Sequence, residues 1–163
     1  MLHKPEQWAS EYAKPFQDRS VVEAYRYRPP YPPEVFEILA GLIKAGPQSP
    51  RHVLDVGCGT GYIARYFVDR VERLDAVDCS WPMIEQGKAL PNGDHPRLRW
   101  LYGHVEDIAL DPPYSLVTAG ESLHWMEWTI VLPRLHKVLL HRVVSFAKWL
   151  LSGAHGTCAS RSL

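Results

Sequence analysis

Three glycines stand at alternate positions directly after a short apolar run, and this spacing suits a ligand-binding loop. They are Gly57, Gly59 and Gly61, and the apolar run covers residues 52–56. Because glycine has no Cβ, the backbone of such a loop can approach a ligand closely. A helix that follows the loop presents free N–H groups at its amino end. The pattern predicts a bound ligand here, with a glycine-rich turn that binds nothing as the alternative.

The spacing of the glycines argues against two other nucleotide-binding loops. A dinucleotide-binding loop of the G-x-G-x-x-G type needs its third glycine at position 62, which is Tyr62. A P-loop needs a lysine after its last glycine, and no lysine follows Gly61. The sequence therefore favours neither a dinucleotide site nor a P-loop.

Two acidic residues fall where a nucleoside-binding α/β fold would use them. Asp78 ends the second predicted strand, 21 residues after Gly57, and a carboxylate there can accept hydrogen bonds from both ribose hydroxyls. A helix-capping or surface role is the alternative for Asp78. Asp55 lies inside the apolar run, and because an unpaired buried carboxylate is costly, we expect it to have a partner.

Alternating strands and helices must position these residues. Apolar runs bounded by turn residues predict strands at residues 52–56, 73–77, 98–102 and 114–119, and helical spacing predicts helices at residues 34–44, 62–71, 82–89 and 130–138. The buried face of the first helix is expected to contain Val35, Ile38, Leu39 and Leu42. This alternation predicts the α/β class, with an open, mainly parallel, Rossmann-like sheet and flanking helices.

We divide the chain into an N-terminal strap (residues 1–33), a core (34–151) and a flexible tail (152–163). The strap ends in a proline-rich run, which favours extended or turning backbone because proline fixes φ and lacks an N–H.

The composition of the 163 residues indicates one globular domain with a small ligand. Lys plus Arg and Asp plus Glu both number 18, and no long basic run is available to bind phosphates, so nucleic acid is not an expected partner. The three cysteines lack metal-ligand spacing, so we expect no metal and a reducing, cytoplasmic location. We recognise neither a secretory leader nor an apolar stretch of membrane-spanning length.

The string D-V-G-C-G-T-G at residues 55–61 resembles the cofactor loop of class I S-adenosylmethionine-dependent methyltransferases and is highly specific for them. The likeness is to the small-molecule, type-11 group that includes trans-aconitate methyltransferase. It runs from about Phe16 to Leu139 and takes in Y-R-P-P-Y-P at residues 27–32 and L-H-W at residues 123–125. It implies S-adenosylmethionine as cofactor and a small-molecule methyl acceptor, reacting at oxygen.

The resemblance implies a set of cofactor-binding residues: Asp55, Gly57, Cys58, Gly59, Gly61, Asp78, Met83, Val105 and Glu106. Met83 would pack on the adenine, although a core role is nearly as common for such a methionine. The Val105 N–H and the Glu106 carboxylate would read the adenine edge, because His104 stands where many relatives have Asp. A solvated loop carboxylate is the alternative for Glu106.

Methyl transfer from a sulfonium mainly requires that the nucleophile is positioned and water excluded. A base is needed only when the acceptor is protonated, and His124, after the fourth strand, is the candidate because histidine titrates near neutrality. Trp125 would wall an apolar acceptor pocket. By resemblance, Tyr25, Arg28 and Tyr31 would fold over the site as a lid. Plain packing of these side chains is the alternative.

After Leu139 the chain departs from its relatives, which continue with a Pro-Gly-Gly turn and further strands. Residues 140–151 contain neither proline nor glycine, so we expect the preceding helix to continue and the sheet to lack the C-terminal strands of the full domain. The fourth strand would then be an uncovered edge, open to self-association. The alternative is that apolar residues of this segment cover part of the edge: Val143, Val144, Phe146, Trp149 and Leu150. A truncated, non-catalytic form that keeps the cofactor site is therefore the alternative to an active enzyme.

Overall fold

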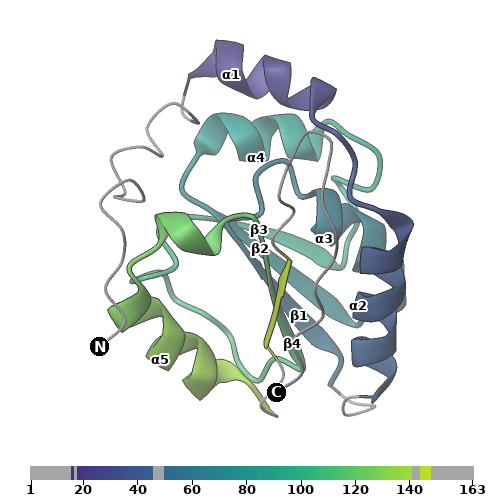
Figure 1. Ribbon diagram of the computed structural model, residues 1–163, viewed down its shortest axis with the longest axis vertical. Coiled ribbons are helices and arrows are strands. Elements are labelled where there is room, and N and C mark those ends of the chain that lie inside the picture. Colours follow the sequence, from purple (N-terminus) through teal and green to yellow (C-terminus); the bar gives the residue numbers. More distant parts are fainter. Residues whose placement is uncertain (1–15, 17, 46–49, 141–143, 148–163) are drawn as a thin grey trace, which may run out of the picture.

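The computed structural model describes residues 16, 18–45, 50–140 and 144–147. The helices are α1 (Arg19–Ala24), α2 (Pro33–Ala45), α3 (Tyr62–Phe67), α4 (Trp81–Lys88) and α5 (Trp128–Val138), with 3-10 helices η3 (Tyr25–Tyr27), η4 (Val68–Arg70) and η5 (Leu123–Trp125). The strands are β1 (His52–Val56), β2 (Arg73–Asp78), β3 (Leu98–Tyr102), β4 (Leu116–Gly120) and β5 (Val144–Ala147). The helices surround a central sheet (Figure 1).

The described strands form one parallel sheet in the order β3-β2-β1-β4-β5. Leu54 of β1 lies opposite Asp75 of β2 on one side and Val117 of β4 on the other. The chain builds outward from β1 to β3 and then returns to the other side of β1. Such a reversal opens a crevice at the carboxyl ends of the strands, where ligands bind in open α/β sheets.

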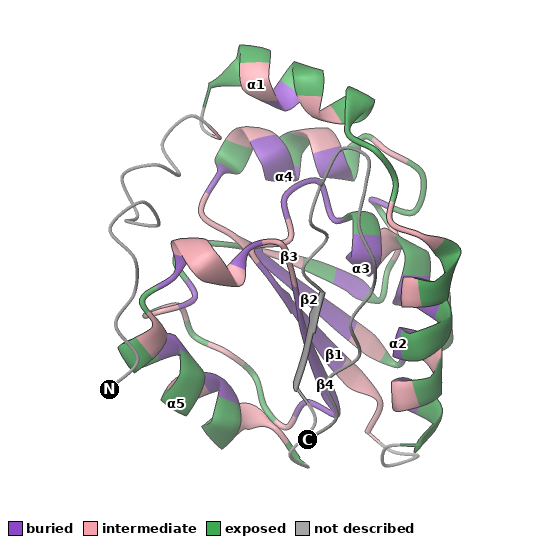
Figure 2. Cartoon of the chain, viewed as in Figure 1, coloured by how far each residue is buried: buried purple, intermediate pink, exposed green. Residues whose placement is uncertain are grey.

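Alternate strand residues supply two cores on opposite faces of the sheet. Val53 and Leu116 pack with residues of α2 and α3, whereas Leu54 and Val117 pack with residues of α5. The helices lie on opposite sides of the sheet in Figure 1, and the central strands are buried along most of their length (Figure 2). Burial on both faces explains why these strands read as continuous apolar runs.

The core elements agree with the prediction in type and order. The buried face of α2, however, differs from the predicted one. Phe36, Leu39 and Ile43 are buried, whereas Ile38 is 62% exposed, so its predicted burial is wrong. Apolar residues occupy more than one face of this helix, and the Phe36 ring decides which face turns inward by packing 5.9 Å from the Phe67 ring.

The strap is partly helical, and α1 is absent from the sequence-based prediction. Asp18 caps this helix, because its carboxylate accepts a hydrogen bond from the Ser20 backbone N–H at 2.8 Å. The hydrogen bonds from Ser20 lower the pKa of Asp18. Within the proline-rich run at residues 27–33, residues 28–32 are not helical, as predicted, whereas Tyr27 ends η3 and Pro33 begins α2.

The segment after α5 also differs from the prediction. The helix ends at Val138 because Leu139 is extended, and the Leu140 N–H donates to the Tyr114 carbonyl at 2.8 Å. Strand β5 then pairs in parallel with β4. The predictions of a continuous helix and of an uncovered β4 edge are therefore wrong, because pairing with β5 satisfies backbone groups of β4. The alternative, in which residues of this segment cover the edge, agrees with the pairing of Val144 and Phe146 with β4.

Strand β4 has a partner strand on each side. The predicted self-association required an unpaired β4 edge, and the described residues do not provide one. The tail predicted at residues 152–163 lies outside the described residues. None of the helices in the described part of the chain combines the length and the apolar character that a membrane span requires.

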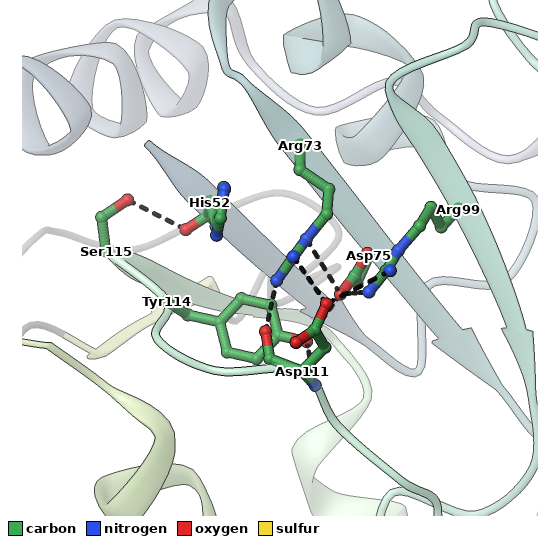
Figure 3. Close-up of polar contacts among 7 residues, drawn as sticks. All are labelled: His52, Arg73, Asp75, Arg99, Asp111, Tyr114 and Ser115. Carbon is green, nitrogen blue, oxygen red and sulfur yellow. Dashed lines mark hydrogen bonds and ion pairs between the residues drawn. The ribbon is translucent and has the colours of Figure 1, made fainter. Parts of the chain in front are cut away.

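A buried carboxylate ties the amino ends of the strands together (Figure 3). Asp75, which is fully buried, accepts hydrogen bonds from Arg99 at 2.6 and 2.7 Å and from the Tyr114 hydroxyl at 2.6 Å. Arg73 lies 3.5 Å from the same carboxylate and pairs with Asp111 at 2.7 Å. The network fixes β2, β3 and the start of β4 at the end of the sheet opposite the crevice.

Candidate functional site

The glycine loop joins β1 to α3, and its backbone requires glycine. Gly57, Gly59 and Gly61 have φ angles of 62°, 56° and 70°, in the left-handed region that other residues rarely adopt. A Cβ at Gly57 would lie 2.4 Å from the Ser122 Cβ, and one at Gly61 would lie 2.5 Å from Cη2 of Trp100. A Cβ at Gly59 would meet no atom closer than 3.7 Å. Gly57 and Gly61 are therefore packed tightly, whereas Gly59 has room beside it.

Asp78 ties this loop to the end of β2. Its carboxylate accepts the Gly59 N–H at 2.7 Å and the Ser80 N–H at 2.8 Å. Burial raises the pKa of Asp78, and these two hydrogen bonds oppose that rise. A carboxylate has about four acceptor positions, so Asp78 is held in place with acceptor capacity to spare.

A cavity of about 240 Å³, which we call the loop cavity, lies beyond the carboxyl ends of β1, β2, β3 and β4. It brings together most of the predicted site residues: Tyr25, Arg28, Gly57, Gly59, Asp78, Met83, Val105, Glu106, His124 and Trp125. Asp55, Cys58 and Tyr31 instead line a neighbouring cavity of about 250 Å³, which we call the strap cavity. Gly61 lines neither cavity.

Part of the lining of the loop cavity is apolar and buried. Met83 and Val105 are almost completely buried, with 2% and 4% of their surface exposed. The Glu106 carboxylate accepts the backbone N–H of Glu127 at 3.0 Å. Glu106 is therefore held by the residue that precedes α5 and is not a freely solvated loop carboxylate.

Asp55 supports the glycine loop from within β1 and has the partner that its burial demands. The Thr118 hydroxyl of β4 donates a hydrogen bond to Asp55 at 2.8 Å, and the Ala64 backbone adds another. Burial raises the pKa of Asp55 to about 7, against the effect of these hydrogen bonds. Close to neutral pH, this carboxyl group is only partly ionised.

The strap reaches over the loop to the end of β4. The Arg28 guanidinium forms an ion pair with Glu121 and donates a hydrogen bond to the Tyr25 hydroxyl. Glu121 has a φ of 54°, which is uncommon for a residue with a side chain. The Tyr31 hydroxyl lies 2.6 Å from where a Cβ on Gly120 would be, so the strap approaches β4 closely. Tyr25 and Arg28 line both cavities.

Phe16 closes another side of the loop cavity. Its carbonyl accepts a hydrogen bond from the Ser80 hydroxyl at 2.6 Å. Its ring centroid lies 6.3 Å from that of Tyr25 and 6.1 Å from that of Trp125, in edge-on contacts. These contacts connect the strap to η5 across the cavity.

The segment after β4 brings an imidazole and an indole to the loop cavity. His124 and Trp125 lie in η5 with ring centroids 4.4 Å apart. The Ser122 hydroxyl donates to the Val56 carbonyl at 2.6 Å and so joins this segment to β1.

Cys58, in the glycine loop, has a buried thiol. Burial raises the pKa of this thiol well above its ordinary value, so Cys58 is not an ionised nucleophile.

The residues that line the loop cavity without having been predicted as site residues include Phe16, Gly120, Glu121 and Ser122. Their types carry no distinctive signal in the sequence. Gly120 is the last residue of β4, and Glu121 and Ser122 follow it. They become site residues because β4 lies beside β1 in the sheet, and this strand order cannot be deduced from the sequence.

Comparison with known proteins gives a consistent family. Residues 53–141 match the methyltransferase domain family. An uncharacterised methyltransferase of Mycobacterium tuberculosis is 34% identical over 122 residues, covering 74% of this chain and 46% of that protein. The malonyl-[acyl-carrier protein] O-methyltransferase of Anoxybacillus flavithermus is 33% identical over 87 residues, covering 52% of this chain and 33% of that protein. The chain thus spans less than half the length of these curated relatives.

Solved structures agree with the fold. The CcbJ methyltransferase of Streptomyces caelestis superposes with a TM-score of 0.59 at 25% identity, covering 80% of this chain and 55% of that one. CalS10, an amino pentose methyltransferase of Micromonospora echinaspora solved with S-adenosylmethionine bound, gives a TM-score of 0.64 at 20% identity over 78% of this chain and 55% of that one. This second likeness concerns the fold alone.

Proposed function

Because this chain belongs to the class I S-adenosylmethionine-dependent methyltransferases, we propose that its loop cavity binds S-adenosylmethionine and that the protein methylates a small molecule at oxygen. The observation that carries the proposal is the position of Asp78, whose carboxylate lines the cavity at the end of β2 while the Gly59 N–H holds it.

The residues of the loop cavity fit the cofactor. A Cβ at Gly59 would approach only the Tyr25 ring, at 3.7 Å, and without one the backbone can lie against a ligand. The spare acceptor positions of Asp78 suit the two ribose hydroxyls. Met83 and Val105 form an apolar surface suited to the adenine, with the Glu106 carboxylate nearby as an acceptor for its amino group. Gly61 contributes to this site indirectly, by packing the start of α3 against Trp100.

The bound cofactor supplies a methyl group on a sulfonium, which is already activated for transfer. The chain's own task is then to orient the acceptor and to exclude water. Phe16, Tyr25 and Trp125 are the aromatic side chains that enclose the cavity, and Arg28 fixes the strap to the end of β4 through Glu121. His124 lines the same cavity and would take the proton from a hydroxyl acceptor as methyl transfer proceeds.

Two lines support an oxygen acceptor. Relatives that match about half of this chain are named malonyl-[acyl-carrier protein] O-methyltransferases. The motifs at residues 27–32 and 123–125 resemble the group that includes trans-aconitate methyltransferase. Closer kinship with that group is part of the same proposal.

Isothermal titration calorimetry of the full chain with S-adenosylmethionine and S-adenosylhomocysteine tests the first part. We expect saturable heat with both, and no heat with either at high protein concentration would contradict the cofactor site. Incubation with S-adenosylmethionine and a panel of small hydroxy and carboxylic acids, read by mass spectrometry, tests the second part. Binding without any methylated product would support the alternative, a shortened form that keeps the cofactor site but does not catalyse.

A further inference from the structure

The strap cavity adjoins the loop cavity but has a different lining. The two share Gly57, Gly120 and Glu121 together with the strap residues Tyr25 and Arg28. Apolar and aromatic side chains make up part of its remaining wall: Pro29, Pro30, Tyr31, Tyr62, Ile63 and Leu90. A small molecule in this space would lie beside the glycine loop, outside the part of the site assigned to the cofactor.

The charges around the strap cavity are not balanced. Arg26, Arg28 and Arg65 line it, and Glu121 pairs with Arg28 alone. The other acid in the lining is Asp55, whose pKa burial raises to about 7. Arg26 and Arg65 form no ion pair with any carboxylate of the described residues. The cavity therefore has a net positive lining.

Among the arginines that line the strap cavity, Arg65 has a guanidinium held in place by two hydrogen bonds. Its Nε donates to the Thr60 carbonyl at 3.0 Å and its Nη1 to the Pro91 carbonyl at 2.9 Å. Burial lowers its pKa, although a guanidinium stays protonated in proteins. These two bonds use two of its five N–H groups, and the others have no partner among the described residues. A half-buried cation without a carboxylate is unfavourable, and a bound anion would compensate it.

Gln86 provides an independent indication of a ligand. Gln86 is a lining residue of the strap cavity, and its Oε1 is buried with no hydrogen-bond donor among the described residues. Buried side-chain acceptors are normally satisfied. A hydroxyl or an N–H group on a ligand in the cavity would supply the missing donor.

We propose that the strap cavity binds a small organic anion that also carries a hydrogen-bond donor, with Arg65 contacting the anionic group and Gln86 accepting from the donor. This anion is a separate molecule from the cofactor, and its site does not depend on the proposed function.

Titration of the full chain with malate, followed by NMR at constant ionic strength against sodium chloride, tests the site. Malate carries carboxylates and a hydroxyl, and succinate is its analogue without the hydroxyl. We expect saturable malate binding to the wild-type chain, stronger than succinate binding. In Arg65→Gln, we expect the affinity for malate to fall about tenfold or more, as for lost hydrogen bonds to a charged group.

Arg97→Gln is the matched control, because Arg97 also donates to two backbone carbonyls, those of Asp69 and Val71, but lines neither cavity. It should bind malate like the wild type. Gln86→Met should lose the preference for malate over succinate, and it serves as the decisive variant if Arg65→Gln fails to fold. Equal malate affinity in the wild type and Arg65→Gln, or an unchanged preference in Gln86→Met, would overturn the proposal.

Calorimetry with S-adenosylhomocysteine on the same variants identifies the source of the anion. We expect unchanged affinity in Arg65→Gln, because the anion is a separate molecule. A loss of S-adenosylhomocysteine affinity without malate binding would assign the cavity to the cofactor's own carboxylate and overturn the proposal. Malate binding without S-adenosylhomocysteine binding would instead contradict the proposed function and leave the anion site standing.

Discussion

The carboxylate of Asp78 accepts the backbone N–H of Gly59 at 2.7 Å, so the end of β2 and the glycine loop hold each other in place. The same carboxylate accepts the Ser80 N–H, and the Ser80 hydroxyl in turn caps α4 by accepting the Met83 N–H at 3.4 Å. One acidic side chain thereby organises the loop and the start of the helix on which Met83 lies.

We expect Asp78→Asn to weaken S-adenosylhomocysteine binding by about tenfold or more. Hydrogen bonds to charged groups contribute about 1.5–3 kcal/mol, and the amide has only one oxygen to accept both the loop N–H and the ribose. Calorimetry measures the change. Asp94→Asn, at an exposed turn outside both cavities, is the control and should bind like the wild type. Equal affinities for the two variants would remove Asp78 from the cofactor site.

The loop glycines should separate binding from stability. Gly59→Val places a side chain beside the loop, next to the Tyr25 ring and in the space assigned to the cofactor, so we expect S-adenosylhomocysteine binding to be lost. In Gly61→Ala, the new methyl meets the Trp100 ring at 2.5 Å, so we expect a lower melting temperature, with binding retained by the folded fraction. Calorimetry and thermal unfolding on both variants distinguish the two effects. Retained affinity in Gly59→Val would refute the role assigned to this glycine.

The sequence predicts the core of the fold because its signals there are local. The apolar runs of β1 and β3 give their bounds directly, since residues 52–56 and 98–102 are strands in the structure as predicted. The glycine spacing and Asp78 predict one wall of the cavity for the same reason. The end of a strand, a residue with positive φ and the start of a helix are each determined by the types of a few neighbouring residues, so a local sequence pattern can predict them.

What the sequence does not predict depends on contacts between distant residues. Glu121 becomes a site residue only because β4 lies beside β1 and the strap brings Arg28 to it. Strand β5 pairs with β4, whereas residues 140–151 taken alone suggest a helix because no proline or glycine interrupts them. The exposure of Ile38 likewise depends on how Phe36 packs against α3.

The pH dependence of stability should carry a contribution from Asp55. Its pKa is about 7 in the folded chain, against 3.8 for the unperturbed group, so the folded state holds a proton that the unfolded state has released. The free energy of unfolding should therefore fall as pH rises from about 4 to about 7, by roughly 1.4 kcal/mol per pH unit from this group. Urea unfolding across this range measures the slope.

Asp55→Asn isolates that contribution, because the amide can still accept from Thr118 but does not titrate. We expect the free energy of unfolding of this variant to depend less steeply on pH than that of the wild type, with the two curves diverging above about pH 4. Parallel curves would show that Asp55 is ionised in the folded chain at these pH values.

Removal of the carboxylate at the amino end of the sheet should destabilise the fold without touching the site. Asp75 is fully buried against Arg73, Arg99 and Tyr114, and breaking a buried ion pair by removing one partner costs roughly 3–5 kcal/mol. We expect Asp75→Ala to lose about that much free energy of unfolding in urea, and Asp111→Ala, whose side chain is 59% exposed, to lose about 1 kcal/mol or less. Because neither residue lines the loop cavity or the strap cavity, S-adenosylhomocysteine affinity of the folded protein should be unchanged in both. Equal losses of unfolding free energy in the two variants would contradict this prediction. They would mean that Arg73 and Arg99 remain solvated without Asp75, and that the network contributes little to the pairing of β2 with its neighbours.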